Sequence, residues 1–192
     1  MKSYDLIWIG TGQATGHGGC HTASQERQTD RNRRGRVGGT CVNYGCTPTK
    51  TLVASARRPY GSPGPTLAYK PGEIAIDFAK VMARMNKIRN NNSEELESWL
   101  TGLDGVDFYR AYASFEDAHR AVGEESIYGE TIVVHTGARA RKPPLPGLDE
   151  VAWLDNVRLL HLQKLPEHLV ILGGSYIQPG ICSGLPPLWQ RP

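Results

Sequence analysis

The chain has 192 residues, a length that suits one domain, or one domain and the start of a second. A hydrophobic fraction of 39% argues against disorder throughout, and no apolar run approaches the roughly 18 residues of a membrane span. Four cysteines are too few for a disulfide-stapled secreted scaffold, and the short N-terminal apolar run does not suit a signal peptide. We therefore expect a protein of the reducing cytoplasm with no membrane association.

The formal net charge of +3 is concentrated in one segment. Residues 15–37 contain five arginines and two acidic residues, so they hold the whole excess and the rest of the chain is neutral. This distribution argues against a general nucleic-acid-binding surface. Nucleic-acid binding through Arg27–Arg36 is a separate hypothesis. A solvated charged loop is favoured over it, because no aromatic or helical platform accompanies the arginines.

Residues 4–9 form a short apolar run that ends at Gly10-Thr11-Gly12. The pattern predicts a buried parallel strand followed by a glycine loop. A helix and a second strand should follow and complete a βαβ unit. Residues 15–37 cannot form them, because only three of these residues are apolar and glycines interrupt the segment. We interpret 15–37 as an aberrant, solvated loop in place of the first crossover.

Regular structure is expected to resume at Gly38. Thr47-Pro48 lies near a helix start, where proline is tolerated, and residues 50–58 have a helical pattern. Asp77 is a suitable N-cap for a long helix whose apolar residues recur at spacings of three, four or eight. The asparagines at 90–92 are expected to weaken the middle of that helix.

Three short strands are expected in the second half, at residues 106–113, 126–128 and 131–135. The three prolines within 141–146 predict an extended connection. Residues 169–172 form another apolar run that reaches Gly173-Gly174 and resembles the beginning of the chain, which indicates the start of a second nucleotide-binding unit. The prolines after residue 178 exclude the helix that such a unit needs.

Cys41 and Cys46 are the most informative residues of the sequence. Along a regular helix their spacing is a rise of about 7.5 Å, beyond the usual Cα separation of a disulfide. They can form a bond only if the backbone turns irregularly, and Gly45 supplies that freedom. A small ring of this kind can be strained and therefore reducible. Cys46 is expected near a helix N-terminus, which favours a thiolate, with Lys50 on the same helix face.

Two other interpretations of these cysteines stay open. They can be small buried side chains without chemistry, which is the usual outcome for two cysteines in a cytosolic protein. They can also ligate a metal together with His17, Cys20 and His21. Zinc sites favour gaps of two to four residues between ligands, so we predict no metal site.

The string Gly38-Gly-Thr-Cys-Val-Asn-Tyr-Gly-Cys-Thr-Pro-Thr-Lys50 changes this balance. It closely resembles the redox-active segment of the class I pyridine nucleotide-disulfide oxidoreductases, whose pattern is G-G-T-C-x4-C-x-P-x-K. The Thr-Pro-Thr-Lys form looks most like the mercuric-reductase-like members of this family, which also includes dihydrolipoamide dehydrogenase. The resemblance extends over most of residues 1–177 and so covers the N-terminal portion of the family.

The resemblance implies a fold and a reaction. The implied fold is α/β: a Rossmann-like, three-layer FAD-binding domain with a mostly parallel sheet over residues 1–147, its first crossover damaged at 15–37. Residues 148–192 would be a linker and the beginning of an NAD(P)-binding domain. Electrons would pass from NAD(P)H through FAD to a Cys41–Cys46 disulfide, and then to a small-molecule or disulfide substrate.

The resemblance also assigns roles to single residues. Cys41 corresponds to the thiol that attacks substrate, and Cys46 to the thiol beside the flavin. Lys50 corresponds to the residue near the flavin N5 edge. The further residues implied to contact FAD are Gly10, Gly12, Gly39, Thr40, Thr136 and Gly137.

Several positions depart from the family pattern. Thr15 replaces the third glycine of the phosphate-binding turn, and Arg33 stands where an acidic residue should accept the ribose hydroxyl protons. Gln178 and Gly180 replace a glycine and a glutamate of the NAD(P)-binding turn. Two compensating reading-frame shifts around residues 15–35 and a third near Ile177 would produce these departures.

The family's dimerisation domain and its catalytic His–Glu pair have no counterpart in this sequence. The chain is therefore expected to be truncated and inactive alone, although family members are homodimeric enzymes. The alternative is a non-catalytic fragment that associates with a full-length homologue.

Overall fold

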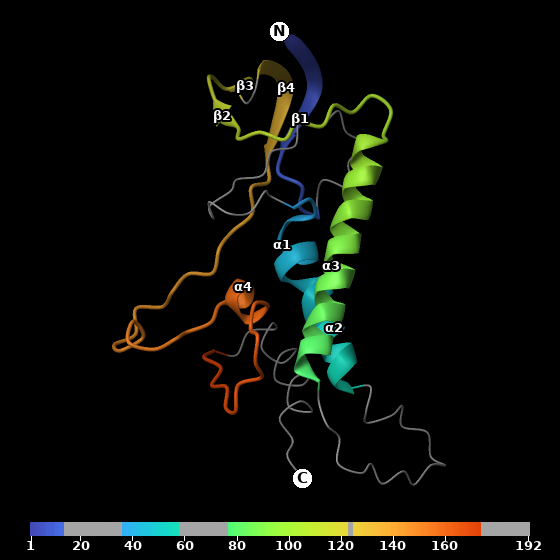
Figure 1. Cartoon of the computed structure of the whole chain (residues 1–192). Helices are drawn as coiled ribbons and strands as arrows, with labels where there is room; N and C mark the ends of the chain where they lie inside the picture. Colours follow the sequence, from blue (N-terminus) through green and yellow to red (C-terminus); the bar gives the residue numbers. More distant parts are fainter. Residues whose placement is uncertain (14–35, 58–76, 123–124, 174–192) are drawn as a thin grey trace. The chain divides into compact units, whose positions relative to one another are not determined.

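The computed structural model describes residues 1–13, 36–57, 77–122 and 125–173 (Figure 1). The chain divides into two compact units, each described by itself below. The sheet unit comprises residues 1–43 and 90–142, and the helix unit comprises residues 44–89 and 143–192.

The described residues of the sheet unit form four strands in the order β1-β4-β3-β2. Their bounds are β1 (Lys2–Ile9), β2 (Ser114–Phe115), β3 (Arg120–Val122) and β4 (Ser126–Val134). β1 and β4 run parallel, with Ile9 opposite Val134, whereas β4–β3 and β3–β2 are antiparallel. The prediction of a mostly parallel sheet is therefore wrong for the described residues. The connections among β2, β3 and β4 are too short for the crossover that parallel neighbours require.

The predicted first strand is confirmed, and β1 begins two residues earlier than expected. Ile7 and Ile9 of β1 are buried together with Ala121 and Ile127, and this cluster is the core of the unit. The two strands expected at 126–128 and 131–135 are one continuous strand, because Gly129 does not interrupt it. A Cβ on Gly129 would lie 2.7 Å from Cδ1 of Ile7, so the glycine makes room for a core side chain.

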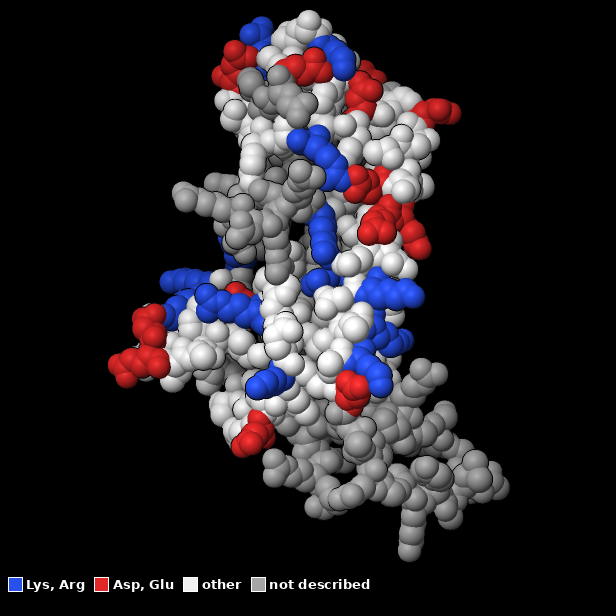
Figure 2. All heavy atoms as spheres, in the orientation of Figure 1, with Lys and Arg blue, Asp and Glu red and all other residues white. Residues whose placement is uncertain are grey.

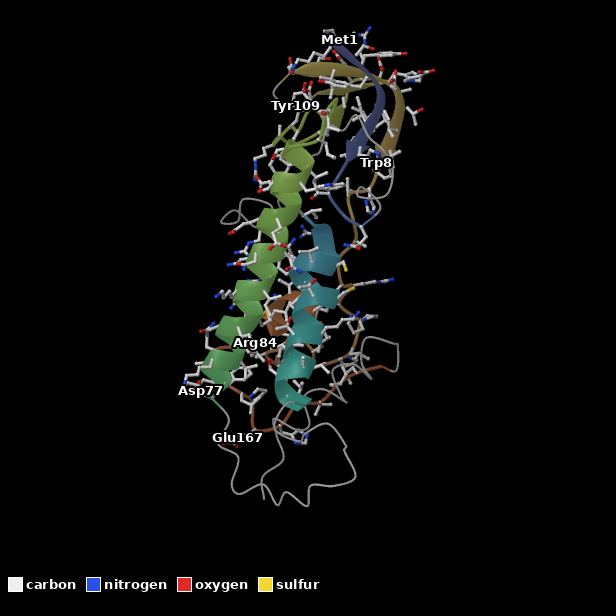
Figure 3. All side chains as sticks on the ribbon, turned by 90° about the vertical axis from the view of Figure 1, so that its right-hand side faces the viewer. Met1, Trp8, Asp77, Arg84, Tyr109 and Glu167 are labelled. Atoms are coloured by element: carbon white, nitrogen blue, oxygen red, sulfur yellow. The ribbon has the colours of Figure 1, made fainter. Side chains whose placement is uncertain are left out.

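The strand expected at 106–113 is absent, since the structure assigns no strand between Thr101 and Ser114. Tyr109 packs instead against the core cluster. Its hydroxyl accepts a hydrogen bond from Lys2 Nζ (3.0 Å) and lies 2.6 Å from the Tyr4 hydroxyl. Figure 3 shows Tyr109 at the end of the unit where the chain begins. Tyr109 therefore contributes to core packing, and its segment does not pair with a strand.

Helix α3 (Phe78–Thr101) passes from the helix unit into the sheet unit as one helix of 24 residues. The predicted cap is confirmed, because Asp77 Oδ1 accepts a hydrogen bond from the Lys80 N–H at 3.0 Å (Figure 3). The expected weakness at the asparagines is wrong, since the helix is unbroken there. Packing offsets the low propensity: Asn90 accepts a hydrogen bond from Arg36, and the buried Ser93 hydroxyl donates to the Val37 carbonyl at 2.7 Å.

The helix unit contains α2 (Cys46–Arg57) and α4 (Asn156–Leu159). Helix α2 starts four residues before the expected 50–58 helix, and Pro48 lies in its first turn as predicted. The core of the unit consists of four buried side chains, Leu52, Met82, Met85 and Leu160. The strand expected at 169–172 is wrong: Val170 and Leu172 are 71% and 61% exposed, and no described strand pairs with this segment.

Charged side chains on the exposed face of α3 change sign along the helix (Figure 2). Lys80, Arg84 and Lys87 give way to Glu94 and Glu95. Within the described ranges, no helix is both long and apolar enough to cross a bilayer. The aberrant loop at 15–37 lies outside the described residues except for Arg36 and Val37, so the interpretation of that segment stays a prediction.

Candidate functional site

Two loops of the sheet unit leave the same edge of the sheet. β1 and β4 are parallel and end level with each other, so the residues after Ile9 and after Val134 emerge together. The His135 N–H donates to the Ile9 carbonyl at 2.8 Å, which extends the pairing beyond the strand ends. The carboxyl edge of parallel strands is the place where ligands bind in open α/β sheets.

Position 10, in the loop that follows β1, requires a glycine. It has a φ of 117°, a conformation that residues with a side chain rarely adopt. A Cβ at this position would also lie 2.1 Å from the His135 carbonyl oxygen. The glycine therefore permits the two loops to touch.

A third loop, residues 36–39, packs against the first. The Gly38 N–H points at both oxygens of Thr11, the carbonyl at 3.1 Å and the hydroxyl at 3.3 Å. A Cβ on Gly39 would lie 2.8 Å from the Cα of Gly12, so the two glycine backbones are in direct contact. We call the three loops, residues 10–12, 36–39 and 135–137, the glycine cradle.

Asn43 fixes the third loop, and the sequence interpretation did not single it out. This side chain, in α1 (Gly39–Tyr44), is 1% exposed. Its amide nitrogen lies 3.0 Å from the Val37 carbonyl and 3.1 Å from the Gly39 carbonyl. The signal in the sequence was an asparagine inside an otherwise regular motif, since an amide can bond backbone groups near a helix start.

His135 and Trp8 are a second feature that the sequence interpretation missed. The two rings meet edge to face, with centroids 6.3 Å apart and planes at 71°. Trp8 lies in β1, next to the strand end (Figure 3). His135 Nδ1 and Trp8 Nε1 are buried and have no hydrogen-bond partner among the described residues. The adjacent Thr136 and Gly137 are exposed, and a Cβ on Gly137 would meet nothing within 4 Å.

The two cysteines fall on consecutive helices. Cys41 is a half-buried residue of α1 in the sheet unit, and Thr40 beside it is exposed. Cys46 is exposed and is the first residue of α2 in the helix unit, as expected for a helix N-terminus. Gly45 separates the two helices. Both side chains are thiols in this structure.

Lys50 lies one turn after Cys46 in α2 and is exposed. The sheet unit thus brings together five of the predicted cofactor residues, from all three loops: Gly10, Gly12, Gly39, Thr136 and Gly137. Lys50 and Cys46 belong to the helix unit. Thr15, Arg33, Gln178 and Gly180 lie outside the described residues.

The chemistry of the cradle fits a dinucleotide. Glycines at positions 10 and 39 let backbone meet backbone, Gly10 against the His135 carbonyl and Gly39 against the Cα of Gly12. Backbone of this kind can approach a pyrophosphate closely. The described residues contain no group of three or more His, Cys, Asp or Glu side chains arranged to hold a metal ion. His17, Cys20 and His21, the other members of the possible metal set, lie outside the described ranges.

Known proteins match nearly the whole chain. A family model described as pyridine nucleotide-disulphide oxidoreductase matches residues 4–178. The chain is 32% identical over 191 residues to the probable pyridine nucleotide-disulfide oxidoreductase RclA of Escherichia coli (strain K12), covering 92% of this chain and 38% of that protein. It is 30% identical over 182 residues to a mercuric reductase of Streptomyces lividans, covering 91% of this chain and 38% of that protein.

A solved structure agrees with these matches. The HOCl-induced flavoprotein disulfide reductase RclA from Escherichia coli superposes with a TM-score of 0.74 at 30% identity. The match covers 96% of this chain and 40% of the RclA chain. The chain therefore spans about two fifths of the length of these relatives.

Proposed function

Because the chain belongs to the pyridine nucleotide-disulphide oxidoreductase family, we propose that it carries the FAD-binding and redox-active part of a flavin-dependent disulfide oxidoreductase. In this proposal residues 1–147 are a Rossmann-like FAD domain, and residues 148–192 begin an NAD(P)-binding domain. The observation that carries it is the glycine cradle, which lies at the carboxyl edge of β1 and β4 and leads directly into the helix of Cys41.

The cofactor residues follow from the cradle. Gly10, Gly12 and Gly39 would hold the pyrophosphate of FAD with backbone groups, and Thr136 and Gly137 would lie over the cofactor. Thr40 and Lys50 are proposed as further contacts. Bound FAD would supply electron transfer from NAD(P)H to a disulfide.

The chemistry of the chain's own residues is thiol–disulfide exchange. Two electrons and two protons convert a Cys41–Cys46 disulfide into two thiols. The Cys41 thiolate then attacks a disulfide substrate, forms a mixed disulfide and releases one substrate thiol with its proton. Cys46 attacks the mixed disulfide, which releases the second thiol and restores the pair. A homodimer and the residues of the longer relatives are needed for the complete cycle in this proposal.

The relatives indicate two classes of substrate, disulfides and soft metal ions. A soft metal ion such as Hg(II) is a second candidate substrate, since one relative is a mercuric reductase and paired thiolates bind soft metals. The disulfide and metal alternatives differ in one respect: thiolates coordinate a metal without any sulfur–sulfur bond to the substrate.

The thiol pair is tested by titration of accessible thiols and by peptide mass spectrometry after oxidation of the full chain. We expect a Cys41–Cys46 cross-link that a dithiol reverses. Cys41→Ser and Cys46→Ser should each abolish it, and Cys182→Ser is the matched control that should leave it unchanged. Failure of the wild-type chain to form this cross-link while it remains folded contradicts the proposal.

A second candidate function is association with a longer homologue. The apolar side chains of Val170 and Leu172 are well exposed, and relatives extend far beyond the matched region. Exposed apolar surface can mark a site of protein–protein interaction. Co-purification with an intact homologue would support this candidate over a chain that acts without a partner. The co-purification should be lost when both residues are changed to serine.

A further inference from the structure

The imidazole of His135 occupies the open face of Gly12. A Cβ built on Gly12 would lie 2.6 Å from Cε1 of His135, and 3.2 Å from each ring nitrogen. The ring therefore packs directly against the Gly12 Cα. In dinucleotide-binding turns the second glycine lacks a side chain so that the pyrophosphate can approach the backbone. Here a side chain of the same protein already fills that approach.

Main-chain contacts hold the backbone of His135, whereas its ring nitrogen Nδ1 has no hydrogen-bond partner among the described residues. The His135 N–H donates to the Ile9 carbonyl, and the His135 carbonyl is held against Gly10. Rotation about the side-chain bonds is thus the only way for the ring to leave Gly12. Thr136 and Gly137, which follow His135 in the chain, are exposed.

The inward position of the ring is weakly held. Its Nδ1 is buried without a hydrogen-bond partner among the described residues, and so is the indole nitrogen of Trp8, against which the ring packs. A buried polar atom without a partner destabilises the arrangement that buries it. In water the same nitrogen would be solvated, which favours departure of the ring once another group fills the site.

From these observations we infer that His135 is a displaceable plug of the glycine cradle: a dinucleotide phosphate enters against Gly12 only when the imidazole swings out. The inference rests on the proposed function, because it assumes that FAD binds at this cradle. It adds that His135 lowers the affinity and slows the entry of FAD. The apparent dissociation constant is the intrinsic one divided by the fraction of molecules in which the ring is out.

The test compares FAD binding to the folded full-length chain and two variants by quenching of flavin fluorescence. His135→Ala removes the ring and should bind FAD roughly tenfold more tightly, as for a ring that is out in about one molecule in ten. His135→Phe is the matched control, because it keeps an aromatic ring on Gly12, and should bind no more tightly than the wild type. Weaker binding by His135→Ala would make the imidazole a contact for FAD and overturn the plug.

A second measurement does not depend on the variants. The His135 ring meets the Trp8 indole edge to face, so its Cε1 proton should have a ring-current-shifted resonance in the free wild-type chain. Saturating FAD should move it to the position of a solvated histidine, and an unmoved resonance would overturn the plug. Equal affinity of wild type and His135→Ala refutes the plug alone, while absence of FAD binding in every folded chain refutes both the plug and the proposed function.

Discussion

At the scale of single residues, Gly10 and Gly39 of the cradle permit close contacts between backbone segments of the protein itself, whether or not a ligand is bound. Gly10 meets the His135 carbonyl, and Gly39 meets the Cα of Gly12. Such contacts are absolute requirements of the fold, since a methyl group has no space. A glycine motif in a sequence can therefore indicate a close approach of two chain segments as well as a ligand site.

Gly10→Ala is expected to destabilise the sheet unit strongly. The left-handed φ alone costs about 1–3 kcal/mol in a residue with a Cβ, and the overlap with His135 adds to it. Gly137→Ala is the matched control: Gly137 also has a positive φ, of 75°, but its Cβ would meet nothing within 4 Å. Urea denaturation should show a clearly larger loss for Gly10→Ala. Equal losses would mean that β1 and β4 do not end as described.

Asn43→Ala is expected to lower the free energy of unfolding by about 1–3 kcal/mol, because it removes the buried amide that donates to the Val37 and Gly39 carbonyls. Asn43→Asp should be at least as harmful, since a carboxylate cannot donate to a carbonyl. Asn91→Ala, on the exposed face of α3, is the control and should change stability little. If Asn43→Asp were as stable as the wild type, the amide would not hold the loop.

At the scale of elements, α3 depends on a defined start as well as on packing. The pKa of Asp77 is lowered first by the hydrogen bond from the Lys80 backbone N–H and then by the Lys80 ammonium, which lies 3.0 Å from the carboxylate. The charged form is thus favoured in the folded chain. The contribution of this cap to stability is fully present above the ordinary carboxyl pKa and is lost as the pH falls through the lowered one.

Asp77→Ala should therefore reduce the Tm by a few degrees at neutral pH, and the difference from wild type should shrink as the pH falls through the lowered carboxyl pKa. Asp77→Asn retains a capping side chain but no titrating group, so the difference in Tm between Asp77→Asn and Asp77→Ala should stay constant across the same range. Thermal unfolding followed by circular dichroism measures both. A difference that grows on acidification would show that the cap does not act through the carboxylate.

Elements with a local cause could be predicted from the sequence. The apolar run of β1, the Asp77 cap and Pro48 in the first turn of α2 each depend on residues within one segment. Asn90 and Ser93 show the limit of that approach, because their partners Arg36 and Val37 are distant in the sequence and keep α3 intact. The segment at 169–172 has the composition of a strand, but a strand needs a neighbour, which composition cannot supply.

The candidate site shows the same division. The Cys-x4-Cys string and the first glycine turn were recognisable as motifs, whereas their meeting with residues 135–137 depends on the parallel register of β1 and β4. Asn43, Trp8 and His135 were missed because their significance lies in contacts between loops. Burial of a side chain against a glycine cannot be inferred from either residue alone.

At the scale of the whole molecule, the chain combines a recognisable family motif with a part of the family's length. It matches about two fifths of RclA and of a mercuric reductase, yet the match runs through nearly all of its own residues. The glycine cradle and the helix of Cys41 belong to one compact unit. Cofactor binding is therefore the property of the proposed enzyme that this chain is best placed to retain.

The absorption spectrum of the purified full chain tests that property most directly. The chain is incubated with FAD, passed through a desalting column and compared with a sample carried through the same steps in urea. We predict that the folded sample retains flavin absorption close to one FAD per chain and that the unfolded sample retains none. The account would be contradicted by a folded chain that leaves the column without flavin. This result would count after incubation with far more FAD than other flavoproteins need for binding.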